Sequence, residues 1–575
     1  MSDGQFDRRT FLRIAGGSTF GLSLLLDACA PPTPAPAPAP AQAPTPAARV
    51  STPPPVATAA AQKLKLPNYL PMQGPKADLP ATSDGLQAGY FTYPQSLSKT
   101  VAQPPGLGGD VTGLTSLPFS PPPPLQDNQA WQAINTELNA NVKLRMVPSG
   151  DYANAVATTM AGGDLPDLFY FNAFGPTTAD LPQFLKTAYA DLTPFLAGEA
   201  IKDYPNLAAF PTASWIPTVF DGALFGVPVV RPPWNYVWYV NQTWLQSIGA
   251  TAPRNADEFK RILIAMTRPQ SNQWGIGAGA PAYGLVNGRG DCPLLAMFGA
   301  PNNWSVDSGG KFTKDFESGE FRAALGYVRE LYAAGVFYPD PVPLNSVILK
   351  TAFIGGKIGV VSTGWASYAV EFWDAALKMS PPIKIRTLAP FSHDGGKPIW
   401  HQFSGLIGMT AVKKASTDRV KELLRILNFL AAPFGSQESL LLEYGVKNID
   451  FTFDARNNPV KTDQGRADTN VMWQYLAWRS PVLYYPADPE FAKVAYADTQ
   501  SMLPGLLADP SLGLYSSTDR SKGGALIQSF SDGLGPIVTG GRPLSDFDQV
   551  LKDWQRAGGD QMRQEYQQAY SESMK

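Results

Sequence analysis

The chain has 575 residues, of which 16% are charged, with 46 Lys and Arg against 48 Asp and Glu. This length predicts two or more lobes, and the net charge of −2 argues against a broadly cationic nucleic-acid binder. The two cysteines are too few for a disulfide scaffold, and the two histidines leave little for a His-rich metal site or a His-based catalytic triad.

Residues 1–29 are typical of an export signal rather than of a folded segment. The pair Arg8 and Arg9 precedes a weakly apolar run at 14–26 that is too short for a transmembrane helix. The twin arginines make this segment resemble a twin-arginine (Tat) signal peptide. It ends in Leu-Asp-Ala-Cys, which resembles a lipobox and predicts lipidation of Cys29. Simple cleavage by a signal peptidase is the alternative.

Two further segments precede the body of the protein. Residues 30–62 are almost entirely Ala, Pro and Thr, which predicts an extended linker of ~3.1 Å per residue. Residues 63–109 contain many prolines and predict an irregular arm packed on the body. No later stretch of ~20 apolar residues is present, so the sequence predicts no transmembrane span.

Strands and helices alternate in the next part of the chain. The patterns predict strands at 110–119, 142–146 and 166–171, with helices near 131–138 and 152–160 between them. This order favours a parallel sheet with crossover helices, and hence the α/β class. Later helices with apolar core faces are expected after Asn255 and Ser416, around 321–332, and after 545.

Four motifs follow one another through the middle of the chain, at 160–171, 224–241, 353–365 and 405–408. Their order and spacing resemble those of family 1 extracellular solute-binding proteins of ABC importers. The resemblance is strongest to the large lipoproteins that bind aldouronates or oligosaccharides. It covers about 160–430, whereas the arm and the tail after 450 match loosely.

The resemblance implies a two-lobed periplasmic-binding-protein-like fold of type II, with discontinuous lobes joined by a hinge. Crossings are then expected near 230, 360 and 404. The implied N-terminal lobe comprises 110–232 and 360–404, and the implied C-terminal lobe comprises 233–359 and 405–575. A solute would sit in the cleft while the lobes close on it.

The resemblance also implies a binding function without catalysis. Nothing in the sequence requires a cofactor or assigns a metal site, and the sequence leaves open whether a structural metal ion is bound. The expected ligand is a carbohydrate, namely an oligosaccharide, either neutral or acidic. The expected partners are two ABC permease subunits in the membrane, driven by a separate ATPase, and no nucleic acid. We expect a monomer outside the cytoplasm, held by its lipid anchor to the cell membrane, in the periplasm or on the outer face.

A sugar presents hydroxyl groups and apolar C–H faces, so its site needs flat aromatic rings and a few fixed polar groups. Such side chains follow predicted strands or lie near the expected crossings. The candidate ligand-binding residues are Asn172, Phe174, Arg231, Trp234, Tyr236, Tyr283, Trp365, Tyr368 and Trp400. Core packing is the alternative for each aromatic residue. Arg231 suits either the carboxylate of an acidic sugar or a salt bridge at the surface or hinge.

Other functions remain open at this stage. A non-sugar solute such as a peptide is the alternative ligand, and a secreted glycoside hydrolase or lyase is the alternative from another class. A sensor subunit that presents its solute to a membrane kinase would share the fold. The S-x-x-K matches at 96–99 and 308–311 lack the companion motifs of penicillin-binding enzymes. Paired glycosidase carboxylates are not recognisable from sequence.

Overall fold

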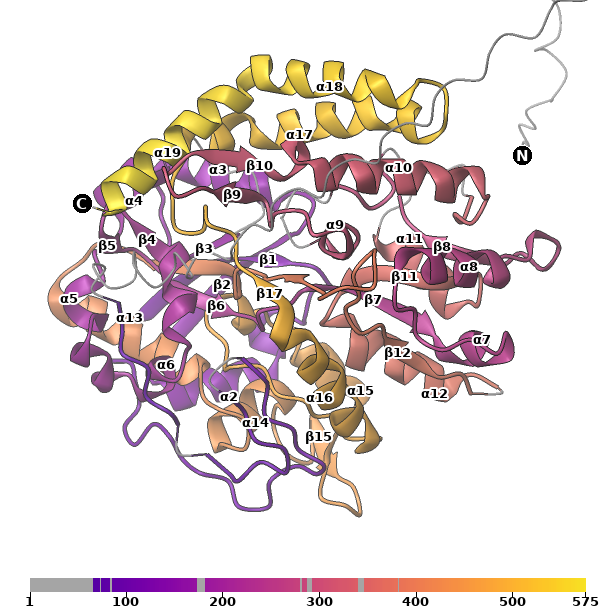
Figure 1. Ribbon diagram of the computed structural model, residues 1–575. Coiled ribbons are helices and arrows are strands. Elements are labelled where there is room, and N and C mark those ends of the chain that lie inside the picture. The colour runs from indigo at the N-terminus through magenta and orange to yellow at the C-terminus, as the bar shows by residue number, and fades with distance from the viewer. Residues whose placement is uncertain are drawn as a thin grey trace, which may run out of the picture. The chain divides into compact units, whose positions relative to one another are not determined.

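The computed structural model describes most of the chain after the linker (Figure 1). The described residues are 66–72, 74–82, 85–172, 181–279, 282–286, 292–339, 346–380 and 382–574. The export signal, Cys29, the linker 30–62 and Phe174 lie outside them, so these predictions stay predictions. Among the described helices, none has the length and apolar character that a membrane crossing requires.

The first sheet has five strands in the order β2-β1-β3-β14-β6. Strand β1 pairs in parallel with both β2 and β3, as the alternation of strands and helices predicts. Strand β14 lies between β3 and β6 and runs antiparallel to both. The strands span Asp110–Leu117 (β1), Asn141–Pro148 (β2), Leu168–Asn172 (β3), Val227–Val230 (β6) and Leu406–Val412 (β14).

Helix α2 (Gln129–Leu138) shows why the crossover elements form where they do. Asn128 caps it by accepting a hydrogen bond from the backbone N–H of Trp131 at 2.8 Å. Trp131, Ile134 and Leu138 are buried on one face, at the spacing expected for an amphipathic helix. Asn139 then ends the helix in the left-handed region, at φ 46°. The second crossover helix is α3 (Tyr152–Gly162).

The second sheet has four strands in the order β12-β7-β11-β8. Strand β11 pairs antiparallel with β7 and parallel with β8, while β12 covers the other edge of β7. The strands span Tyr236–Asn241 (β7), Trp274–Gly277 (β8), Ile358–Gly364 (β11) and Ile385–Thr387 (β12). Both faces of β7 are buried, because Trp238 and Val240 join one hydrophobic cluster whereas Val237 and Tyr239 join another.

The strand order assigns two segments to other lobes than those expected from the sequence. Strands β11 and β12 belong to the second sheet, so residues 360–387 do not join the first lobe. Strand β14 instead completes the first sheet, because its backbone pairs with β3 and β6. The chain therefore passes between the sheets at 231–235 and 388–405 and makes no crossing near 360.

The tail of the chain is divided between the two lobes. Helices α13 (Thr417–Leu430) and α14 (Gln437–Tyr444) contribute to the cluster that covers the first sheet. The last helices contribute to the clusters around the second sheet, so a third passage follows Ala477. Figure 1 shows α17 and α18 running alongside α10. These helices are α10 (Gly319–Ala333), α16 (Glu490–Met502), α17 (Ser517–Val538), α18 (Phe547–Trp554) and α19 (Asp560–Met574).

The arm that precedes β1 is fastened by buried carboxylates. Glu438 Oε1 accepts hydrogen bonds from the backbone N–H groups of Thr100 and Val101 at 2.8 and 2.9 Å. Glu422 Oε1 accepts another from Leu107 at 2.8 Å. These bonds satisfy backbone donors that form no sheet or helix. They hold residues 100–107 against α13 and α14.

Two buried carboxyl groups, Asp450 and Asp468, meet beneath α15 (Asp463–Asp468). Asp450 Oδ2 accepts the backbone N–H of Val446 at 2.7 Å. In the described part of the chain, Asp450 Oδ1 and Asp468 Oδ2 have no hydrogen-bond partner. Burial raises the pKa of Asp450, and the neighbouring Asp468 raises it further. The folded protein therefore holds a proton on Asp450 at pH values where the unfolded chain releases it.

Asp450→Asn is expected to change the free energy of unfolding, relative to the wild type, more favourably at neutral pH than at pH 4. The folded pKa of Asp450 is raised, so the wild type loses stability as pH rises from the unfolded pKa through the folded one. An amide can keep the Val446 contact and donate to Asp468, and it does not titrate. Chemical unfolding of both proteins across this pH range measures the difference. Asp454→Asn is the matched control with the opposite trend, because backbone hydrogen bonding lowers the pKa of exposed Asp454. A difference independent of pH would contradict the prediction.

Candidate functional site

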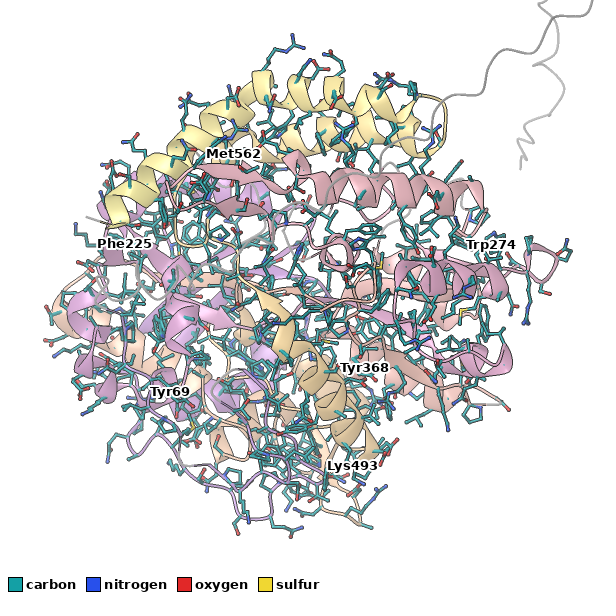
Figure 2. All side chains as sticks on the ribbon, viewed as in Figure 1. Tyr69, Phe225, Trp274, Tyr368, Lys493 and Met562 are labelled. Atoms are coloured by element: carbon teal, nitrogen blue, oxygen red, sulfur yellow. The ribbon has the colours of Figure 1, made fainter. Side chains whose placement is uncertain are left out.

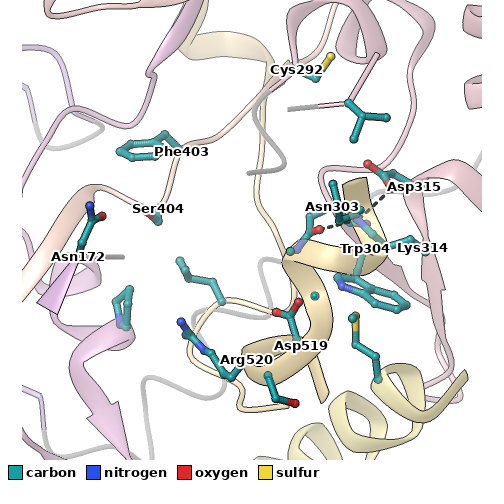
Figure 3. Close-up of a pocket in the computed structure, with 18 of the residues that line it drawn as sticks. Asn172, Cys292, Asn303, Trp304, Lys314, Asp315, Phe403, Ser404, Asp519 and Arg520 are labelled. Atoms are coloured by element: carbon teal, nitrogen blue, oxygen red, sulfur yellow. Dashed lines mark hydrogen bonds and ion pairs between the residues drawn. The ribbon is translucent and has the colours of Figure 1, made fainter. Parts of the chain in front are cut away.

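A cavity of about 730 Å³ lies beyond the carboxyl end of β3, between residues of the two lobes. This is the edge of an open α/β sheet at which ligands generally bind. Figure 3 shows Asn172, Phe403 and Ser404 on one side and Trp304 and Lys314 on the other. Residues 403 and 404 belong to the second passage between the sheets, so the lobes and their connection all contribute to the cavity.

Lys314 and its neighbours form a wall whose charges are paired. Its Nζ lies 2.9 Å from Asp315 Oδ1 and 2.6 Å from Asn303 Oδ1, and both charged side chains are nearly buried. Asn303 adopts a φ of 61°, and its Nδ2 donates to Asp509 Oδ2 at 2.9 Å. Burial raises the pKa of Asp509. This network fixes the wall and leaves little net charge on it.

Aromatic side chains continue the same wall. Trp304, Phe316 and Trp554 all line the cavity. Phe316 and Trp554 meet edge to face, with ring centroids 4.6 Å apart, and Trp304 lies 6.4 Å from Trp554. Rings held in this way offer a firm apolar surface, which suits the C–H face of a sugar.

The first turn of α17 brings two opposite charges to the cavity (Figure 3). Ser516 caps the helix by accepting the backbone N–H of Asp519 at 3.0 Å. Asp519 Oδ2 accepts a hydrogen bond from the Tyr566 hydroxyl at 2.7 Å. Arg520 is half-buried, and within the described residues no carboxylate lies at ion-pair distance from it. Its guanidinium is therefore available to a ligand.

Two of the residues expected from the sequence line a cavity. Asn172, the last residue of β3, lines the cleft, and its position follows from the buried strand before it. Arg231 lines a second cavity instead. Tyr283 packs on Tyr332 and Phe337, and half-buried Tyr236 begins β7. Neither of these tyrosines lines either cavity.

The other four aromatic candidates lie together in the core of the second lobe. Trp234 and Trp365 meet edge to face at 6.1 Å, and Trp365 lies 5.3 Å from Tyr368. The hydroxyl of Tyr368, labelled in Figure 2, donates to Asp498 Oδ2 at 2.7 Å. Trp400 is buried in the same cluster. This placement supports packing roles for these residues and gives no support to ligand contact.

Sequence reasoning missed Asn303, Lys314 and Arg520. Single lysines and arginines carry no sequence signal of a site, and Arg520 lies about 200 residues after the segment that holds Asn303 and Lys314. The one local sequence signal near Arg520 is Ser516, a residue type that favours the start of a helix and here caps α17. The described residues contain no group of three or more His, Cys, Asp or Glu side chains that could hold a metal ion.

Comparison with known proteins places this geometry in context. The family model described as bacterial extracellular solute-binding protein matches residues 122–433, just over half of the chain. The polygalacturonan/rhamnogalacturonan-binding protein YtcQ of Bacillus subtilis is 25% identical over 462 residues, covering 78% of this chain and 89% of the relative. Lipoprotein LipO of the same organism is 23% identical over 479 residues, covering 81% and 93%.

Solved structures share the fold at low sequence identity. A solute-binding protein from Bifidobacterium longum subsp. infantis matches with a TM-score of 0.60 and 14% identity, covering 83% of this chain and 100% of that one. The alginate-binding protein AlgQ2 without calcium ion matches with a TM-score of 0.55 and 16% identity, covering 82% and 100%. The mixed α/β architecture is thus the two-lobed type II binding-protein fold. The chain belongs to the family of bacterial extracellular solute-binding proteins.

Proposed function

We propose that this protein captures an acidic oligosaccharide in the cleft and delivers it to an ABC importer. The observation that carries the proposal is Arg520, a cation in the cleft without a carboxylate partner among the described residues. The other cation that lines the cavity among the described residues, Lys314, is paired with Asp315. A guanidinium binds a carboxylate through two parallel hydrogen bonds, which gives both strength and orientation. The relative YtcQ is named for binding polygalacturonan, a polymer of acidic sugars.

The remaining cavity groups suit the neutral parts of such a ligand. Asn172 and Ser404 offer polar groups at the first lobe and the second passage. Trp304 and Phe403 offer apolar surface for sugar C–H faces. Contacts from both lobes would favour the closed state, because a ligand shifts the hinge only through its better contacts with that state.

Two carboxylates line the cleft among the described residues, Asp315 and Asp519, and their contacts support capture rather than catalysis. Asp315 is engaged by Lys314, and Asp519 accepts a hydrogen bond from Tyr566. A glycosidase needs one carboxylic acid to donate a proton and a second carboxylate to act as base or nucleophile. Both of these carboxylates are already engaged by side chains of the protein itself.

Delivery and anchoring complete the proposal. Lipidated Cys29 would hold the protein outside the cytoplasm, and the linker 30–62 would separate the folded body from the membrane surface. The loaded monomer would then dock on two permease subunits. LipO, a relative over most of the chain, is named as a lipoprotein.

The test is calorimetric binding of trigalacturonate and maltotriose, two trisaccharides that differ in charge, to the full-length protein. We expect saturable binding of trigalacturonate, weaker or no binding of maltotriose, and no new product by chromatography. A thermal shift provides a second readout, since ligand at 100 times its Kd adds ~2.7 kcal/mol of stability. Equal affinity for both sugars would overturn the acidic preference, and product formation would overturn the binding function.

A further inference from the structure

A second cavity, of about 680 Å³, adjoins the cleft and shares Phe403, Ser404 and Leu512 with it. This volume is within the range of ~300–1,000 Å³ typical of small-molecule sites. Its walls come from all three passages between the lobes, at 230–233, 402–405 and 480–482. It therefore lies at the junction between the lobes, and we call it the hinge cavity.

The N-terminal arm forms another wall of this hinge cavity, through Leu86 and Gln87. The arm packs directly on the first passage, because a Cβ at Gly85 would come within 2.7 Å of Pro233. Gln87 also accepts a hydrogen bond from the indole of Trp365 at 3.2 Å. These contacts give the cavity a fixed wall.

Arg231 is the one Lys or Arg residue among the described residues that line the hinge cavity. Its Nη1 donates to the carbonyl of Val230 at 2.8 Å. No carboxylate pairs with it among the described residues, whereas nearby buried Arg479 pairs with Glu443 at 2.6 Å. Burial lowers the pKa of Arg231, whereas the neighbouring Tyr475 and Tyr170 raise it in part. A positive charge held in apolar surroundings without a counter-charge is costly.

Asp509, the acidic residue among the described residues that line the cavity, does not supply that counter-charge. Asp509 Oδ1 accepts hydrogen bonds from Ser511, and its Oδ2 accepts one from Asn303. The hinge cavity thus has apolar walls at Leu86, Pro232 and Pro233, with one unmatched guanidinium. This arrangement fits an organic anion.

We propose that the hinge cavity is a second binding site, for a carboxylate-bearing ligand held by Arg231. The carboxylate would take the guanidinium N–H groups left free by Val230, and the proline rings would cover the rest of the ligand. Two sources fit this chemistry: a free small carboxylate, or a uronate unit of an oligosaccharide that extends past Phe403 and Ser404 from the cleft. The first source is independent of the proposed function, and the second rests on it.

The test is calorimetry on the full-length wild type and on Arg231→Gln, Arg231→Lys and Arg520→Gln. The probes are galacturonate, galactose as its neutral counterpart, and trigalacturonate. Galacturonate should bind the wild type and Arg520→Gln with similar affinity. It should bind Arg231→Gln at least tenfold more weakly, and Arg231→Lys with intermediate affinity. Galactose should not bind the site. Arg231→Gln should unfold at or above the wild-type temperature in the absence of ligand, because it removes an unmatched charge.

Trigalacturonate distinguishes the two sources of the carboxylate. Unchanged trigalacturonate affinity in Arg231→Gln, with galacturonate binding lost, would identify a free carboxylate. Parallel loss of trigalacturonate affinity in Arg231→Gln and Arg520→Gln would identify one ligand spanning both cavities. The wild type could fail to bind trigalacturonate and still bind galacturonate through Arg231. That result would contradict the proposed function and support this second site.

Two outcomes would overturn the proposal. The first is equal affinity of wild type and Arg231→Gln for both acidic probes. The second concerns Asp84, which follows Thr82 of the cavity wall in sequence and lies outside the described residues. If Asp84→Asn acquires galacturonate binding that the wild type lacks, the chain's own carboxylate serves Arg231.

Discussion

Arg520→Gln is expected to weaken the binding of trigalacturonate about 10- to 100-fold. Hydrogen bonds to charged groups contribute ~1.5–3 kcal/mol, and each 1.4 kcal/mol changes an equilibrium constant about tenfold. Arg520 has no carboxylate partner among the described residues, so the whole of its charge is available to the ligand. Titration calorimetry of the purified variant measures this loss.

Arg556→Gln is the matched control for this experiment. Arg556 also lies in the second lobe, but it is exposed and pairs with Asp553 on the same helix surface. We expect wild-type affinity in this variant. If Arg520→Gln lowers the affinity for neutral and acidic sugars equally, Arg520 maintains the shape of the cleft and does not bind the carboxylate.

Trp365→Ala is expected to lower the free energy of unfolding by ~3–5 kcal/mol, as large-to-small substitutions of buried aromatic residues do. Trp365 is 7% exposed, contacts Trp234 and Tyr368, and donates a hydrogen bond to Gln87. The substitution removes these contacts and leaves a cavity in the second lobe. Urea unfolding followed by circular dichroism measures the change. The folded variant should keep its affinity for sugar, because Trp365 does not line the cleft.

Phe119→Ala provides the comparison, because Phe119 is 58% exposed and its truncation should change stability little. Wild-type stability of Trp365→Ala together with lost sugar binding would restore the role that sequence reasoning gave Trp365. Trp365→Phe, which keeps most of the apolar volume, should fall between the wild type and Trp365→Ala in stability.

The aromatic candidates show where sequence reasoning stops. Trp234 and Trp365 lie close to sheet ends, where both cleft and core residues occur. Strand β7 is covered on both faces, so the alternation of side chains along it cannot separate a ligand face from a core face. Asn172 was predictable because a buried parallel strand leads directly to it, and the carboxyl end of such a strand meets the cleft.

Local structure was predicted better than the pairing of distant segments. Asn255 and Ser416 cap helices as expected, since capping depends on residues within one turn. The place of β14 in the first sheet depends on backbone pairing with β3 and β6, which precede it by more than 170 residues. Arg520 reaches the cleft for a similar reason, because the third passage brings α17 back to the second lobe. Neither arrangement leaves a local pattern in the sequence.

The position of β14 between β3 and β6 also sets the order in which the two sheets can be completed during synthesis. In the five-stranded sheet, β6 pairs with β14 alone, so it has no partner until residue 412 has been made. The four strands of the second sheet lie within 236–387 and are available earlier. The long separation between β3 and β14 makes closure of the first sheet a slow, non-local step. A nascent chain therefore carries an unfinished first lobe while its second sheet is already complete, and exposed strand edges favour misassociation until β14 arrives.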